Sequence, residues 1–245
     1  MNPIVVIPAR LASRRLPGKP LAEIGGEPMI VHVWRRAREA GLGPVLVACA
    51  ETEIADAVRA AGGDAVLTRR DHPSGSDRVF EAVESVDADG AYDVVVNLQG
   101  DFPTVDARDL AAVTEPLSDP ACDIATLVNP FASSADIADP NKVKAAVEAA
   151  PGARTGRVLF FSRNPVPAGE GPIYHHIGIY AYRRAVLARF VRLPRGVLET
   201  RERLEQLRAL GAGMRIDATF VDSSPMGVDT PADLDRARAQ LVPGA

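Results

Sequence analysis

Two hydrophobic periodicities alternate along the first hundred residues of the chain. Short continuous apolar runs, typical of strands buried on both faces, are separated by stretches with apolar residues every three or four positions, as in amphipathic helices. The pattern predicts strands at 4–9, 45–49, 65–67 and 92–98. It predicts helices at 29–40, 52–61 and 76–84. Apolar strands joined by helices indicate a largely parallel sheet covered on both faces, within an α/β fold.

The pattern changes between about residues 120 and 180. Short strands are expected there, separated by turns and by a Pro/Gly-rich loop at 165–172, and they are predicted at 124–128, 142–147, 157–161 and 176–182. Beyond them we expect a helix at 198–210, a strand at 214–220 and a closing helix at 231–240 with Asp229 or Thr230 as its cap. The simplest interpretation is one domain, 1–245, with an antiparallel subregion inserted at roughly 125–182.

Composition limits the classes of partner. The 245 residues carry a net charge of −4, which disfavours general attraction to nucleic acid or to anionic membranes. No apolar run approaches the roughly 18 residues of a membrane span, and no signal peptide is recognisable, so we expect a cytoplasmic protein. Cys49 and Cys122 are far apart in the chain and show no metal-binding spacing.

A basic loop follows the first predicted strand. It contains Arg10, Arg14, Arg15 and Lys19, with a Pro17-Gly18 turn among them. Ligands of open α/β sheets bind where strands end, and closely spaced cations hold phosphate oxygens through charge-assisted hydrogen bonds. The loop lacks the P-loop and dinucleotide-binding glycine patterns. It therefore predicts a different kind of triphosphate site, the alternative being a solvated basic loop.

Two carboxylates are candidates for a metal site. Asp101 follows Gly100 at the end of the strand predicted at 92–98, and Asp229 precedes the last helix. Each has a simpler explanation, Asp101 as part of a turn and Asp229 as a helix cap. Together with the basic loop they predict a site in which Mg²⁺ neutralises a triphosphate.

The motifs together resemble the 3-deoxy-manno-octulosonate cytidylyltransferase family. The resemblance runs from residue 4 to about 238, with the motifs in the family order. The first is the basic loop, Pro-Ala-Arg-x-x-Ser-x-Arg-Leu-Pro-Gly-Lys-Pro-Leu from Pro8. The others are Ser74-Gly75-Ser76-Asp77-Arg78, Gln99-Gly100-Asp101, Asn141 with Val143-Lys144, Phe161-Ser162-Arg163, His176-Ile177-Gly178-Ile179-Tyr180, Leu204-Glu205-Gln206-Leu207-Arg208 and Gly227-Val228-Asp229-Thr230-Pro231.

The resemblance implies a three-layer, Rossmann-like α/β fold of the nucleotide-diphospho-sugar transferase type, with a mostly parallel sheet. It implies transfer of CMP from CTP to a small acidic sugar with Mg²⁺ as cofactor, and a homodimer formed through the inserted subregion. It assigns catalysis to Lys19, Asp101 and Asp229, the last two holding Mg²⁺. CTP would be bound by Ala9, Arg10, Arg15, Lys19, Ser74, Arg78 and Gln99. The acceptor would be bound by Gln99, Arg163, His176, Tyr180, Glu205 and Gln206.

The chain departs from the family pattern at several positions. Phe102 replaces a glutamate after Gln99-Gly100-Asp101, and Arg14 adds a cation to the basic loop. Ala48-Cys49-Ala50 stands in place of Ala-Thr-Asp, and Gly211-Ala212 in place of Glu-Asn. These departures leave phosphonoformate open as an alternative acceptor to 3-deoxy-manno-octulosonate. A nucleotide-binding protein without catalysis is a further alternative, and on pattern alone His176 is compatible with a purely structural role.

Overall fold

A computed structural model describes residues 1–13 and 15–242 of the chain. Arg14, the additional cation of the basic loop, lies outside the described residues. The chain forms two compact units. The first combines Met1–Ala111 with the segment that begins at Pro225, and the second is Ala112–Ser224.

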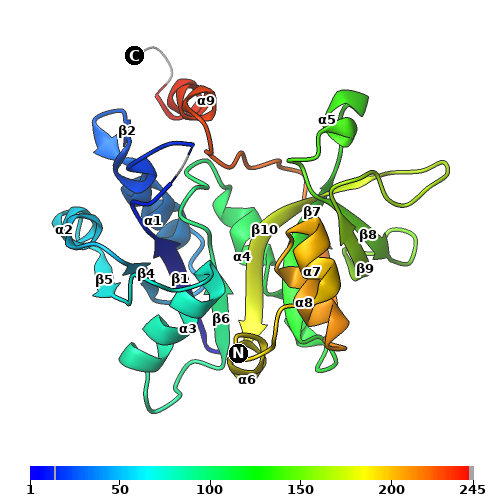
Figure 1. Ribbon diagram of the computed structural model, residues 1–245, viewed down its shortest axis with the longest axis horizontal. Coiled ribbons are helices and arrows are strands. Elements are labelled where there is room, and N and C mark those ends of the chain that lie inside the picture. Colours follow the sequence, from blue (N-terminus) through cyan, green and yellow to red (C-terminus); the bar gives the residue numbers. More distant parts are fainter. Residues whose placement is uncertain (14, 243–245) are drawn as a thin grey trace. The chain divides into compact units, whose positions relative to one another are not determined.

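Four parallel strands form the centre of the first unit. Their order is β5-β4-β1-β6, and Val5 of β1 lies opposite Val45 of β4 and Val96 of β6. Every residue of β4 and β6 is buried, which explains why these strands show no polar alternation. The strands, blue to blue-green in Figure 1, are β1 (Pro3–Ala9), β4 (Val45–Cys49), β5 (Asp64–Leu67) and β6 (Val94–Asn97).

Helices connect these strands, as the sequence predicts. They begin and end within two residues of the expected positions, and Gly62, at φ +84°, follows the end of the second as a left-handed glycine cap. The helices are α1 (Met29–Glu39), α2 (Thr52–Ala60) and α3 (Gly75–Val86). Shorter elements that the pattern did not predict are η1 (Lys19–Leu21), β2 (Glu23–Ile24), β3 (Glu27–Pro28) and α4 (Ala107–Ala112).

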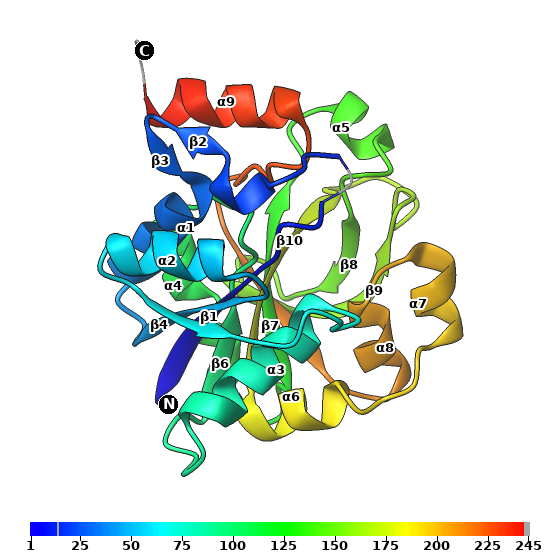
Figure 2. The ribbon, with the colours of Figure 1, turned by 60° about the vertical axis from the view of Figure 1, so that its left-hand side comes forward.

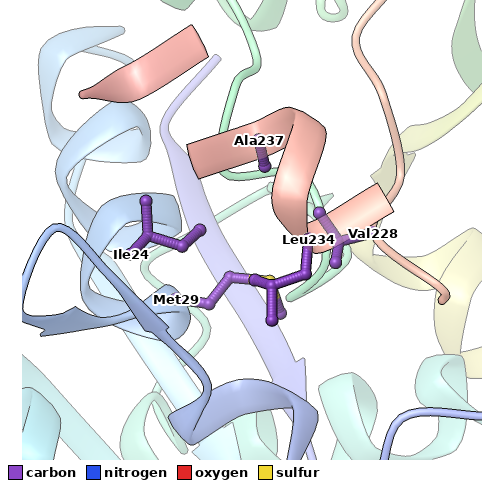
Figure 3. Close-up of a cluster of buried hydrophobic side chains, with 5 residues drawn as sticks. All are labelled: Ile24, Met29, Val228, Leu234 and Ala237. Carbon is purple, nitrogen blue, oxygen red and sulfur yellow. The ribbon is translucent and has the colours of Figure 1, made fainter. Parts of the chain in front are cut away.

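The C-terminal helix α9 (Pro231–Leu241) packs on N-terminal elements of the first unit. Ile24, Met29, Val228, Leu234 and Ala237 form one buried apolar cluster, shown in Figure 3. Thr230, and not Asp229, is the N-cap: its hydroxyl accepts a hydrogen bond from the backbone N–H of Asp233, 3.2 Å away. The Asp229 carboxylate is therefore available for other contacts.

The second unit is built on a mixed sheet. Its strand order is β10-β7-β11-β9-β8, and β10 also pairs with β8. The pairings are antiparallel except that of β7 with β11, so the expected antiparallel strands belong to a mixed sheet. The strands labelled in Figure 2 are β7 (Ile124–Pro130), β8 (Lys144–Glu148), β9 (Thr155–Ser162) and β10 (Tyr174–Arg183). The fifth strand is β11 (Ile216–Phe220). The short helices are η2 (Glu115–Ser118), α5 (Ser134–Ala138), α6 (Arg184–Phe190), α7 (Val197–Glu202) and α8 (Gln206–Gly211).

The prediction of a single helix at 198–210 is wrong. The chain forms α7 and α8 instead, because Arg203 adopts a left-handed conformation at φ +55° and ends α7. The two helices remain linked by a buried ion pair, in which Arg208 Nη2 lies 2.6 Å from Glu199 Oε1. The apolar spacing continues through the break, which is why the sequence pattern did not reveal it.

A search of the described part of the chain for a helix long and apolar enough to cross a membrane finds none.

Anchoring of α9 can be tested by core truncation. Leu234 is 6% exposed in the apolar cluster, so Leu234→Ala is expected to lower the free energy of unfolding by about 2–5 kcal/mol, as cavity-forming substitutions do. Leu67, which is 50% exposed, is the matched control, and Leu67→Ala should cost less than about 1 kcal/mol. Urea denaturation of both variants measures the difference. Equal losses would contradict the packing described for α9.

Candidate active site

A pocket of about 860 Å³ lies in the first unit, where β1 and β6 end and α3 begins. The three predicted first-unit motifs meet in it: the basic loop, the Ser74–Arg78 segment and Gln99-Gly100-Asp101, together with Asp229. The residues that line the pocket are Pro8, Ala9, Arg10, Ala12, Ser13, Arg15, Lys19, Pro20, His72, Ser74, Gly75, Arg78, Gln99, Gly100, Asp101 and Asp229. All the residues predicted to bind CTP or metal are among them.

Backbone contacts fold the basic loop over the end of β1. The N–H of Gly18 donates to the carbonyl of Leu11 at 3.2 Å, and Gly18 adopts φ +70°, the left-handed conformation that glycine tolerates best. The N–H of Leu11 donates to Glu51 Oε2 at 3.0 Å. Glu51, which was not predicted as a site residue, lies 40 residues away in the chain. Its side chain holds the backbone of the loop.

The basic loop and the two carboxylates form one network of ion pairs. Lys19 Nζ lies 2.7 Å from Asp101 Oδ2 and 3.1 Å from Asp229 Oδ1. Arg15 Nη2 lies 2.9 Å from Asp229 Oδ2. Burial by itself lowers the pKa of Lys19, but the charges and hydrogen bonds of the two carboxylates outweigh burial and raise that pKa. Lys19 is therefore a fully charged ammonium held between two carboxylates.

Close backbone contacts bring the two carboxylates together. A Cβ on Gly100 would lie 2.9 Å from the carbonyl oxygen of Pro8, so only glycine lets the segment before Asp101 approach β1 so closely. The N–H of Val228 donates to the carbonyl of Asp101 at 2.9 Å. Phe102, where the family usually has glutamate, packs beside Gly227, with its ring 3.7 Å from the position of a Cβ there.

The start of α3 forms another wall of the pocket. Ser74 caps the helix, accepting from the N–H of Asp77 at 3.2 Å. Arg78 is buried, and its guanidinium donates to the Thr68 hydroxyl and to the carbonyl of Arg69. Burial and the positive charge of Arg10 lower the pKa of Arg78. Ser74 and Arg78, both predicted to bind CTP, thus also make hydrogen bonds within the wall of the pocket.

Gln99 and His72 complete this wall. The amide of Gln99 donates to Asn97 Oδ1 at 2.8 Å. His72, which the sequence analysis missed, is buried and pairs through Nε2 with Glu81. The only signal for His72 was its position two residues before Ser74.

Residues predicted to bind the acceptor, except Gln99, lie in the second unit. The rings of His176 and Tyr180 lie 5.5 Å apart on β10, and Gln206 Nε2 lies 3.5 Å from His176 Nδ1. His176 Nε2 is 3.0 Å from the hydroxyl of Thr126, which donates to the carbonyl of Ile179 at 2.8 Å. Since that hydroxyl has one proton to donate, this arrangement assigns the proton of His176 to Nε2.

Burial keeps this cluster uncharged. It lowers the pKa of His176 to about 3, with a smaller contribution from His175. It raises the pKa of Tyr180, with smaller contributions from Tyr182 and Glu205. The cluster therefore presents neutral hydrogen-bonding groups near neutral pH, with Glu205 as its acidic neighbour.

Arg163 makes contacts that sequence analysis did not anticipate. Its guanidinium donates to the carbonyls of Glu202 at 2.8 Å, Pro140 at 2.8 Å and Arg203 at 3.4 Å. The buried Lys144 donates to the carbonyl of Arg163 at 3.0 Å. These contacts fix Arg163 in place, and its predicted role as a clamp for the acceptor's carboxylate stays a prediction.

Comparison with known proteins agrees with the residue pattern. A cytidylyltransferase family model matches residues 4–216. The chain is 62% identical over 241 residues to a 3-deoxy-manno-octulosonate cytidylyltransferase from Paramagnetospirillum magneticum, covering 98% of each chain. It is 63% identical over 242 residues to one from Rhodospirillum centenum, covering 99% of this chain and 94% of the relative.

Solved structures give the same result for the fold. The chain is similar to a structure of CMP:2-keto-3-deoxy-manno-octonic acid synthetase complexed with CTP, with a TM-score of 0.90, 42% identity and 98% of each chain covered. A 4-diphosphocytidyl-2C-methyl-D-erythritol synthase, 16% identical with a TM-score of 0.65 and covering 98% of this chain and 97% of the other, shares the fold. The chain, an α/β nucleotidyltransferase in fold, belongs to the 3-deoxy-manno-octulosonate cytidylyltransferase family.

Proposed function

We propose that this protein transfers CMP from CTP to 3-deoxy-manno-octulosonate and releases pyrophosphate. The observation that carries the proposal is the meeting of Arg15 and Lys19 with Asp101 and Asp229 in one pocket at the end of β1. Cations for a triphosphate and carboxylates for a metal are the groups that nucleotidyl transfer requires. Relatives about 60% identical that are named for this acceptor support the choice of substrate.

In this reaction a hydroxyl oxygen of the acceptor bonds to the α-phosphorus of CTP, and the bond to the β-phosphate oxygen breaks. The hydroxyl proton passes to solvent, and pyrophosphate leaves. Arg10, Arg15 and Lys19 bind the triphosphate and stabilise the charge that develops on the leaving group. Ser74, Arg78, Gln99 and the backbone near Ala9 hold the nucleoside in the pocket.

The residues fit Mg²⁺. Two carboxylates converge on one cationic group at 2.7 and 3.1 Å, and Mg²⁺ in nucleotide sites is usually held by one or two carboxylates plus phosphate oxygens. No group of three or more His, Cys, Asp or Glu side chains suited to a metal occurs among the described residues, so nucleotide oxygens would complete the coordination. Asp101 and Asp229 would hold the ion, which would lower the pKa of a coordinated hydroxyl and neutralise charge on the α-phosphate.

The inserted strands provide a candidate dimer surface. We infer, from the family resemblance, a homodimer formed through the 125–182 region, where Leu159 on β9 is 55% exposed and available for contact. Sedimentation velocity of the full chain should show a dimer, and Leu159→Asp should shift it toward monomer because a charge would be buried at the contact. A monomeric wild-type chain would overturn the inference.

The metal assignment can be tested at both carboxylates. Asp101→Asn and Asp229→Asn keep the side-chain size but remove the charge, so each should lower pyrophosphate release by at least about 100-fold, since metal ions contribute several kcal/mol to such reactions. Asp56→Asn, on the exposed face of α2, is the matched control and should leave the rate unchanged. Circular dichroism checks the fold. Near-normal turnover in either site variant would overturn the assignment.

An acceptor screen tests the substrate and separates the alternatives. With CTP and Mg²⁺, pyrophosphate release is expected with 3-deoxy-manno-octulosonate, and little or none with phosphonoformate or with no acceptor. Release with phosphonoformate alone would transfer the assignment to that acceptor. Absence of release with every acceptor, despite CTP binding, would favour the non-catalytic alternative.

A further inference from the structure

The ion pairs in the pocket link the two halves of the proposed metal–triphosphate site. Both contacts of Lys19 Nζ are with the carboxylates assigned to the metal, and Arg15 contacts one of the same carboxylates. Two positive and two negative side chains are thus neutralised within the site. Two of the three N–H donors of Lys19 Nζ face carboxylates, so Nζ can turn all its donors to a phosphate only by leaving Asp101 and Asp229.

Lys19 contributes most to this neutralisation. Its side chain is 16% exposed and that of Asp101 is 25% exposed, whereas Arg15 is 58% exposed. An exposed pair such as Arg15 with Asp229 contributes little, while a charge shared between two carboxylates in a partly buried place is held more firmly. Lys19 Nζ lies where a cation would contact both carboxylates, so an ammonium and a divalent ion would repel each other there.

We propose that Lys19 couples metal binding to CTP binding by exchanging its partners. The triphosphate draws Nζ away from Asp101 and Asp229, and only then do these carboxylates bind a divalent cation tightly. This inference rests on the metal assignment of the proposed function. Because coupling between two binding sites is reciprocal, the metal must raise the affinity for CTP by the same factor.

The residue type suits such an exchange. Lysine is used only at positions 19, 142 and 144, while Lys and Arg together number 28, so arginine is the usual cation of this chain. An ammonium on a flexible four-carbon stem moves between oxygen ligands as a point charge, whereas an arginine fork is fixed more strongly by bidentate geometry. Pro20, buried directly after Lys19, anchors the backbone while the side chain moves.

Metal binding in the absence of nucleotide provides the test. Mn²⁺ binding to the full chain, measured by electron paramagnetic resonance without CTP, should be weak in the wild type and tighter in Lys19→Met. The expected gain lies between about 5-fold and 150-fold, the usual range of coupling between sites. Lys19→Arg, which keeps a cation beside the carboxylates, should bind Mn²⁺ as weakly as the wild type. Lys142→Met, which removes a cation paired with Asp136 in the second unit, is the control for loss of charge elsewhere.

Two further measurements locate and confirm the effect. Adding Asp101→Asn to Lys19→Met should abolish the gain in Mn²⁺ affinity, because the second carboxylate is then lost. By equilibrium dialysis, saturating Mg²⁺ should raise the affinity for CTP by a larger factor in the wild type than in Lys19→Met.

The outcomes separate this inference from the proposed function. Equal Mn²⁺ affinity in the wild type and Lys19→Met would overturn the coupling role of Lys19, while inactive Asp101→Asn and Asp229→Asn variants would leave the proposed reaction intact. Gain in Mn²⁺ affinity that survives Asp101→Asn would also overturn the inference, because the ion would then be bound elsewhere.

Discussion

The ammonium of Lys19, held between Asp101 and Asp229, is the contact at which three distant segments of the first unit meet. Its partners lie 82 and 210 positions away in the chain, so the contact requires the loop after β1, the end of β6 and the segment before α9 to meet. Each segment is placed by a separate feature: the left-handed Gly18 turn, the close approach of Gly100 to Pro8, and the apolar cluster beneath α9. Backbone turns and apolar packing thus bring the three segments together, and the charged side chains then lie close enough to pair.

The fold of the first unit was largely predictable because its local signals agree with its tertiary structure. Continuous apolar strands, a glycine helix end at Gly62 and a Thr-Pro helix start at Thr230 each gave the observed element. The second unit was less predictable. Arg203 takes a left-handed conformation that the apolar spacing does not reveal, and β7 pairs in parallel with β11 through residues far apart in sequence. A residue of ordinary helix propensity gives no warning that it will end a helix.

In the candidate site, the positions of the residues could be predicted from the sequence, but their contact partners could not. The places of Asp101 and the basic loop followed from strand ends, where parallel sheets bind their ligands. The residues that they contact could not be predicted in this way. Lys19, expected to bind phosphate, contacts carboxylates, and Glu51 holds the loop at Leu11 through a contact that no motif marks. Arg163 donates to three backbone carbonyls. Residue type and spacing predict which groups are near a ligand, whereas pairing depends on which opposite charge the fold brings closest.

The distribution of charge bears on which acceptor the protein uses. Arg10, Arg15 and Lys19 lie in the first unit, where a triphosphate requires fixed positive charge. In the second unit the predicted acceptor residues include His176, kept neutral by burial with a pKa of about 3, and Tyr180, whose pKa burial raises. Glu205 lies beside them, with its Oε1 3.5 Å from Arg208 Nη2. Arg163 is the cation among the predicted acceptor residues, and it already donates to three backbone carbonyls. A small acceptor with several negative charges, such as phosphonoformate, therefore gains little from these groups. A polyhydroxylated sugar acid can donate hydroxyls to Glu205 and exchange hydrogen bonds with Gln206. The chemistry of these side chains therefore agrees with 3-deoxy-manno-octulosonate, the acceptor that the family resemblance implies.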